Sequence, residues 1–437
     1  MNTGYQASRL IPSPDSYMSI REKEMRSLLK NRTCMKTVSI ILILFAWTQN
    51  SLPQSADNYL LGRAYMVREH YDSALVHFDL ALEKNPGNID ILYNRGLCHF
   101  NLRQYTKSHE DFYQVERRQK GMASYYLAKT EVRLNHPEQA IKYLRIHLSS
   151  QYKMPERDIL LDDELSTLEK RDDWKALWNE RTWYNKNDRD FQEALLSISK
   201  GSYLDAINTL NDLERTGYNK SKVLTLKAEI YELLGNQKAM MSEIDKAVKS
   251  DVRNHKALHI RAKYYLLDGK YREALSDCDK LIRLNPSDFD AYLVRAVAKS
   301  ETGDLNGAVE DIDIYLIYFP RDDSAYFLKG KIQYGHNKYL NAIMSINKAL
   351  ELNQGKAEYY HYRGLVYSKT GTLQYAENDF SMALDLNPEN GETWLEKGKV
   401  AARLGKHETA CFDYIKAYQY GVSQARSFID KNCMMKE

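Results

Sequence analysis

The sequence predicts an all-α fold, a superhelical solenoid of antiparallel helical hairpins that ends in a C-terminal capping helix. Two observations predict it. From Asn187 onward the chain divides without a gap into seven units of 34 residues, and these units repeat small residues at their positions 8 and 20. Because the units of such an array contact only their neighbours, a chain of 437 residues needs no single large core.

The seven units share a pattern that suits two closely packed helices. Their first residues are Asn187, Ser221, His255, Phe289, Asp323, Ala357 and Gly391. Position 8 is Ala in four units and Gly in three, and position 20 is Ala in six. Small residues let the two helices cross closely, and overpacking a crossing costs about 1–3 kcal/mol. Six units carry Gly at position 15, which favours the left-handed backbone of a helix C-cap.

The rest of the chain divides around this array. Less regular units begin at Ser55, Ile89 and Gly121, so we expect about ten hairpins in all. A stretch rich in Leu and Trp breaks the period after them and predicts a non-repeat helical segment. The predicted parts are a leader (1–54), an N-terminal array (55–150), the non-repeat segment (151–186), a C-terminal array (187–424) and a capping helix with a tail (425–437).

The repeat pattern resembles that of the tetratricopeptide repeat family. That family sets an aromatic residue near position 4, Gly or Ala at 8, Ala at 20, a large apolar residue at 24 and Pro at 32. Position 4 is matched by Tyr292, Tyr326, Tyr360 and Trp394, and position 32 by Pro286, Pro320 and Pro388. The acidic, Leu- and Trp-containing stretch at 172–178 is similar to segments of tetratricopeptide proteins of bacterial envelopes.

This resemblance implies a scaffold that binds a protein or peptide, and no motif in the sequence points to catalysis. Gly398, Gly405 and Lys406 hint at a phosphate loop, but both glycines are explained as repeat positions 8 and 15. None of the five cysteines forms a Cys-x-x-Cys pair, which argues against a zinc site. We therefore expect no enzyme activity, no cofactor and no metal. The alternative is a docking or regulatory subunit of a separate enzyme.

The charge distribution argues against nucleic acid as the partner. Lys and Arg number 62 and Asp and Glu 59, so the net charge is +3. The first 36 residues hold seven Lys or Arg and three Asp or Glu, a balance of +4, so the rest of the chain is close to −1. The repeat region is nearly neutral, whereas nucleic-acid binding needs a clustered basic face.

The N-terminal region has the order of an export signal. An apolar run over residues 38–47 follows Lys36 and precedes a polar stretch, and Met35 is a possible true start of the chain. We expect export to the periplasm or cell envelope, with a mature N-terminus between Ser51 and Asp57. The alternative is an uncleaved N-terminal anchor, which would be the only attachment of the protein to a membrane.

The family resemblance also implies where a ligand binds. In tetratricopeptide repeats the first helix of each hairpin lines the concave face, chiefly through positions 2, 5, 9, 12 and 13. With position 6, these positions of the C-terminal array supply Lys256, His259, Lys263, Lys331, Tyr334, His361, Tyr362, Lys369, Lys399 and Arg403. Cations beside aromatic rings suit an acidic or aromatic peptide, although Glu358 and Glu396 share the face.

Three cations of this predicted face, Lys331, Lys369 and Lys399, are expected to be exposed. Their replacement by Glu should then leave folding unaffected and test the face by the affinity for a partner. In the alternative interpretation, these charges only keep a helical surface soluble.

The last two cysteines are expected to lie close together. Cys411 falls in the second helix of the last unit, and Cys433 ends the cap that should fold back on it. In an oxidising compartment they could form a disulfide, which typically contributes about 2–4 kcal/mol. The alternative is two unpaired thiols.

Overall fold

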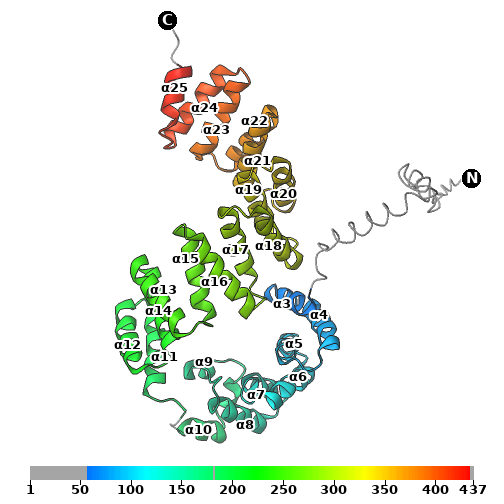
Figure 1. Ribbon diagram of the computed structural model, residues 1–437. Helices are drawn as coiled ribbons and strands as arrows, with labels where there is room; N and C mark the ends of the chain where they lie inside the picture. The colour runs from blue at the N-terminus through cyan, green and yellow to red at the C-terminus, as the bar shows by residue number, and fades with distance from the viewer. Residues whose placement is uncertain (1–56, 181–182, 434–437) are drawn as a thin grey trace, which may run out of the picture. The chain divides into compact units, whose positions relative to one another are not determined.

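The computed structural model describes residues 57–180 and 183–433, which hold 23 α-helices, one short 3-10 helix and no strand. The predicted all-α fold is therefore confirmed. Consecutive helices pack as hairpins, three before the non-repeat segment and seven after it (Figure 1). The predicted leader and its apolar run lie outside the described residues.

The helices fall into three groups along the chain. The first three hairpins are formed by α3 (Asn58–Val67), α4 (Tyr71–Lys84), α5 (Ile89–Asn101), α6 (Tyr105–Arg118), α7 (Ser124–Arg133) and α8 (Pro137–Leu148). The non-repeat segment holds α9 (Glu156–Leu160), the 3-10 helix η2 (Ser166–Leu168) and α10 (Asp172–Asn179). The other hairpins are α11 (Lys186–Ser199) with α12 (Tyr203–Thr216), α13 (Lys220–Leu233) with α14 (Gln237–Ser250), α15 (His255–Leu267) with α16 (Tyr271–Leu284), α17 (Phe289–Glu301) with α18 (Leu305–Tyr318), α19 (Asp323–Gly335) with α20 (Tyr339–Leu352), α21 (Ala357–Thr370) with α22 (Leu373–Leu386), and α23 (Gly391–Arg403) with α24 (His407–Gln419).

The 34-residue frame sets where these helices start and stop. The side chains of Asn254, Asp288 and Asp322, each the last residue of a unit, accept hydrogen bonds from backbone N–H groups at the start of the next helix. Such N-caps satisfy donors that a helix leaves unpaired. The glycine after the first helix has the positive φ that its position requires, as at Gly303 (φ 90°).

Close helix crossings explain the small residues at position 8. A Cβ added to Gly364 would lie 2.8 Å from the ring of Phe380, and one added to Gly96 would lie 2.9 Å from the ring of Phe112. Where position 24 holds a smaller side chain, such as Cys278, position 8 is Ala262 instead. An aromatic ring at position 24 thus leaves room only for Gly at position 8, as a densely packed crossing requires.

Buried ion pairs recur within the hairpins, each extended by a more exposed contact to the preceding hairpin, and we call this series the position-7 ladder. Arg295 at position 7 donates from Nε and Nη2 to the two carboxylate oxygens of Asp311 at position 23, over 2.9 and 2.7 Å. Its Nη1 bonds Asp279, at position 25 of the preceding unit, over 2.8 Å. The same two-pronged contact to position 23 recurs at Arg95, Arg261 and Arg363. The sequence analysis did not identify this ladder.

The non-repeat segment packs against the first array through a small core of its own. Leu165, Leu168, Trp174 and Leu177 are buried in the same cluster as α7 and α8. Lys129 of α7 binds Asp162 and Glu164 of the segment, over 2.8 and 3.1 Å.

The C-terminal end is closed by α25 (Ala425–Asn432), which packs on α24. A disulfide joins Cys411 of α24 to Cys433, and their Cα atoms are 5.5 Å apart. Among the described residues, no helix combines the length and the apolar character that crossing a membrane requires.

Candidate peptide-binding face

The first helices of successive hairpins lie next to one another. Contacts link α15 to α17, α17 to α19, α19 to α21 and α21 to α23, and α3 to α5 in the N-terminal array. Side chains from several repeats therefore share one face, which we call the first-helix face. All ten residues predicted to bind a peptide belong to α15, α19, α21 or α23.

Four of the ten predicted residues meet on α19 and α21. The ring of Tyr362 lies 6.2 Å from that of Tyr334 and 5.6 Å from that of His361, and Lys331 Nζ is 4.9 Å from the centre of the Tyr362 ring. His361 Nδ1 is 2.8 Å from Thr393 Oγ1, and burial lowers the pKa of His361. A neutral imidazole supplies no charge for an acidic peptide.

Most of the predicted cations already have partners within the chain. Lys331 Nζ lies 3.3 Å from Glu358, and Lys399 Nζ lies 2.7 Å from Glu396. The expected exposure of these lysines is therefore wrong, because each side chain is only 38% or 30% accessible. Lys369 is exposed, as expected. A triple exchange to Glu would break two ion pairs, so it would test structure together with binding.

The remaining predicted residues do not join this cluster as a single basic surface. Lys256 pairs with Glu229, and His259 Nδ1 lies 3.3 Å from Asp288. Lys263 is exposed on the same helix. Arg403 donates over 2.9 Å to the carbonyl oxygen of Ser368.

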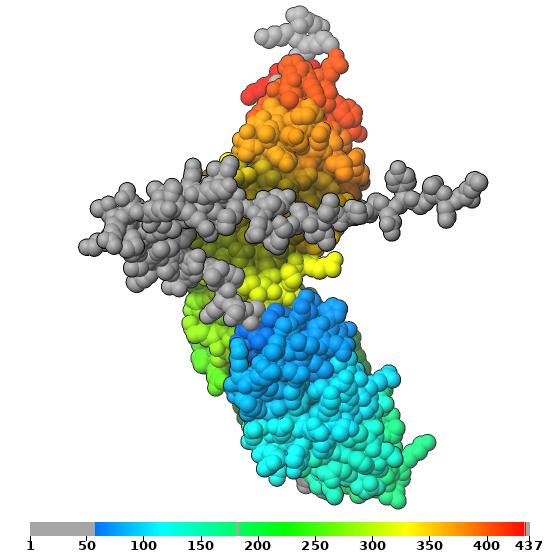
Figure 2. Space-filling view, turned by 90° about the vertical axis from the view of Figure 1, so that its right-hand side faces the viewer, coloured from blue at the N-terminus to red at the C-terminus, as the bar shows by residue number. Residues whose placement is uncertain are grey.

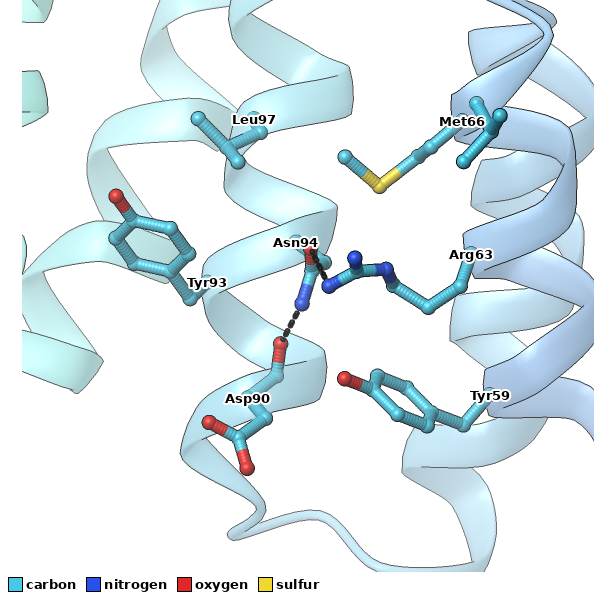
Figure 3. Close-up of a pocket in the computed structure, with 8 residues that line it drawn as sticks. Tyr59, Arg63, Met66, Asp90, Tyr93, Asn94 and Leu97 are labelled. Carbon is cyan, nitrogen blue, oxygen red and sulfur yellow. Dashed lines mark hydrogen bonds between the residues drawn. The ribbon is translucent and has the colours of Figure 1, made fainter. Parts of the chain in front are cut away.

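A hollow also lies at the N-terminal end of the array, between α3 and α5. This pocket has a volume of about 440 Å³, within the range of small-ligand sites (Figure 3). It is lined by Tyr59, Arg63, Met66 and Val67 of α3 and by Asp90, Tyr93, Asn94 and Leu97 of α5. Apolar and aromatic side chains therefore surround a small group of polar ones.

The guanidinium of Arg63 crosses the middle of this pocket. Its Nη1 donates to Asn94 Oδ1 over 3.2 Å, and the Asn94 amide nitrogen in turn donates to the carbonyl oxygen of Asp90 over 2.6 Å (Figure 3). The buried Nε of Arg63 has no hydrogen-bond partner among the described residues, and no ion pair with Arg63 occurs there. The arginines of the position-7 ladder differ from Arg63, because each of them donates two hydrogen bonds to one carboxylate. Arg63 also hydrogen-bonds the side chain of Tyr59, but among the described residues no carboxylate pairs with its charge.

The pocket was missed by the sequence analysis, although its signal was present. Counted from Ser55, its α3 residues occupy positions 5, 9, 12 and 13, and counted from Ile89, its α5 residues occupy positions 2, 5, 6 and 9. These are the ligand-facing positions that the family resemblance implies. They were considered only in the C-terminal array.

Ten helical hairpins, seven of them in an unbroken 34-residue frame, define a helical-repeat solenoid. Sequence profiles of the tetratricopeptide repeat match residues 77–110 and residues 323–356. At these two segments the chain carries tetratricopeptide repeats. No curated protein matches it in sequence.

Several solved structures are similar to this chain. A tetratricopeptide repeat protein from Parabacteroides merdae shares 18% identity, with 56% of this chain and 96% of that one covered and a TM-score of 0.46. YrrB, described as a TPR protein with an unusual peptide-binding site, shares 17% identity over 43% and 97% of the chains, with a TM-score of 0.35. Yeast Tom70 shares 14% identity over 85% and 94%, with a TM-score of 0.39.

The titratable side chains of the described residues form no metal centre. No group of three or more His, Cys, Asp or Glu residues there could hold a metal ion. Two cysteines, Cys98 and Cys278, are buried free thiols, and burial raises the pKa of each thiol to about 12. Because a thiolate is the reactive form, these two act as small core side chains.

Proposed function

We propose that this protein is a non-catalytic scaffold that binds a protein or peptide along the first-helix face, with the α3–α5 pocket as the anchor point. The pocket between α3 and α5 is the observation that carries the proposal. It combines apolar walls with a cation that no carboxylate of the described residues pairs with, and apolar walls with a few polar groups are typical of small-ligand sites.

The chemistry of the pocket favours an acidic residue next to an apolar one. Met66, Val67 and Leu97 offer apolar surface, and the rings of Tyr59 and Tyr93 stand on opposite sides (Figure 3). Arg63 offers charge-assisted hydrogen bonds to a carboxylate, which are shorter and stronger than bonds between neutral groups.

The proposal is tested by selecting peptides from a random display library against the whole chain. We expect enriched peptides to carry Asp or Glu beside an aliphatic or aromatic residue. Replacing Arg63 by Gln should weaken them about tenfold or more, because a hydrogen bond to a charged group contributes about 1.5–3 kcal/mol. Isothermal titration calorimetry measures the change, and thermal unfolding verifies that the variant is folded.

The matched control is Arg403→Gln, which removes an exposed arginine from the C-terminal part of the same face. It should leave the affinity unchanged. Equal binding of the selected peptides to wild type and to Arg63→Gln would refute the pocket as the anchor. If only Arg403→Gln weakened binding, the binding site would lie on α21 and α23. If an enzyme co-purified with the chain, the alternative function, a docking subunit, would be favoured.

We also propose that the protein is exported to the cell envelope. The basic, apolar and polar order around residues 38–47 supports this, and so does the disulfide between Cys411 and Cys433, because disulfides persist in oxidising compartments. We expect N-terminal sequencing of the mature protein to begin between Ser51 and Asp57. A full-length chain recovered from the cytoplasm with both cysteines reduced would contradict export.

A further inference from the structure

The apolar residues of α3 are divided between two different cores. Tyr59, Tyr65 and Met66 pack with the first array, to which the helix belongs in sequence. Leu60, Leu61 and Ala64 instead belong to a cluster formed by α17, α18 and α19. If α3 packed only within its own hairpin, Leu60, Leu61 and Ala64 would have no apolar neighbours on that side.

The second side of α3 contacts a surface rich in aromatic residues. Leu60, Leu61 and Ala64 share a cluster with Phe289, Tyr315, Tyr318 and Phe319. The guanidinium of Arg68 lies 5.4 Å from the centre of the Phe319 ring, and the Tyr318 hydroxyl meets the backbone of Asp57. These residues of α3 follow the spacing of one helix side, since 57, 60, 61, 64 and 68 lie three, four and seven positions apart.

The contact joins helices that are distant in sequence. The neighbours of α18 along the chain are α17 and α19, yet α18 also contacts α3, and both views place the first hairpin beside it (Figures 1 and 2). Adjacent hairpins share the position-7 ladder and a continuous packed core. Among the described residues, no ion pair links α3 to α18.

We propose that α3 is an intramolecular latch, a helix that docks reversibly on the aromatic surface of α17 and α18 and ties the two arrays together. The small size of the contact, compared with the hairpin-to-hairpin interfaces, means that it opens before either array unfolds. When the latch opens, the rings of Phe289, Tyr315 and Tyr318 lose their cover. The latched and open states then differ in which surface the protein presents.

The latch is tested with Leu61→Asp, which places a charge in the contact and leaves the α4 side of the helix intact. We expect hydrogen exchange of the amides at the C-terminal end of α18 to become several-fold faster. We also expect a larger radius of gyration in small-angle scattering, with unchanged helix content by circular dichroism. The matched control is Val76→Asp on α4, an exposed apolar residue of the same hairpin, which should change none of these.

A second variant covers the case in which Leu61→Asp unfolds the first hairpin. Arg68→Gln removes the cation over Phe319, together with its local contacts to Tyr65 and to the Ala64 carbonyl oxygen, so it should speed exchange in α18 in the same direction by a smaller factor. Exchange and scattering equal to wild type in both variants would overturn the latch. So would a scattering mass of two chains for the wild type that falls to one in Leu61→Asp, because the contact would then join separate molecules.

Discussion

Replacing Arg295 by Met is expected to destabilise the middle of the C-terminal array by about 3–5 kcal/mol, the cost of leaving one member of a buried ion pair without its partner. Asp311 is 1% exposed and receives two hydrogen bonds from Arg295. Because Lys299 Nζ still lies 2.9 Å from Asp311 in the variant, we expect the loss of stability to fall near the lower end of that range. Because a repeat array does not unfold in two states, native-state hydrogen exchange of α17 and α18 is the appropriate measurement.

The double variant Arg295→Met/Asp311→Leu separates charge from packing. Replacing both members of a buried ion pair by apolar residues is often neutral or stabilising. We therefore expect the double variant to recover most of the loss. If the single variant costs no more than an exposed substitution, about 0.5 kcal/mol, the ladder does not hold the hairpins together.

The fold was predictable from the sequence because the repeat leaves a local mark in every unit. Small residues at position 8 are required by contacts within one hairpin and glycines such as Gly303 by a positive φ, so each unit carries the evidence independently. The position-7 ladder was visible in the same frame. It was not found because the positions were compared for size and not for charge: Arg295 and Asp311 stand 16 residues apart, as Arg261 and Asp277 do.

The candidate site was predictable only in part. The family positions, when applied to Ser55 and Ile89, identify Tyr59, Arg63 and Asn94, but the ion pairs that occupy Lys331 and Lys399 depend on rotamers that no pattern specifies. The contact of α3 with α18 could not be predicted. It depends on small rotations between hairpins that accumulate over all the intervening helices.

The last rung of the ladder differs from the others, and the difference concerns Asp413. This carboxylate occupies position 23 and is fully buried, but position 7 of its unit is Lys397 and not Arg. Lys397 Nζ lies 3.7 Å from Oδ1, beyond hydrogen-bonding distance, and neither oxygen has a hydrogen-bond partner among the described residues. Burial raises the pKa of Asp413 to about 6, against the opposing charge of Lys397 and with a small further rise from Glu377.

Replacing Asp413 by Asn is expected to stabilise α23 and α24 at pH 7 and to have no effect at pH 4. A carboxyl whose pKa is higher in the folded state stabilises the fold while it is protonated, so its contribution is complete below its unfolded pKa of 3.8 and is lost as the pH rises through about 6. The shift of about two units corresponds to at most about 3 kcal/mol at pH 7. Hydrogen exchange in α23 and α24, compared between wild type and variant from pH 4 to pH 7, measures this difference.

Lys397→Arg is the matched variant. A two-pronged partner like that of Asp311 should lower the pKa of Asp413 and remove the pH dependence without altering the carboxyl. A difference between wild type and Asp413→Asn that stays constant over this range would show that Asp413 is already ionised at pH 4, held by Lys397 despite its distance.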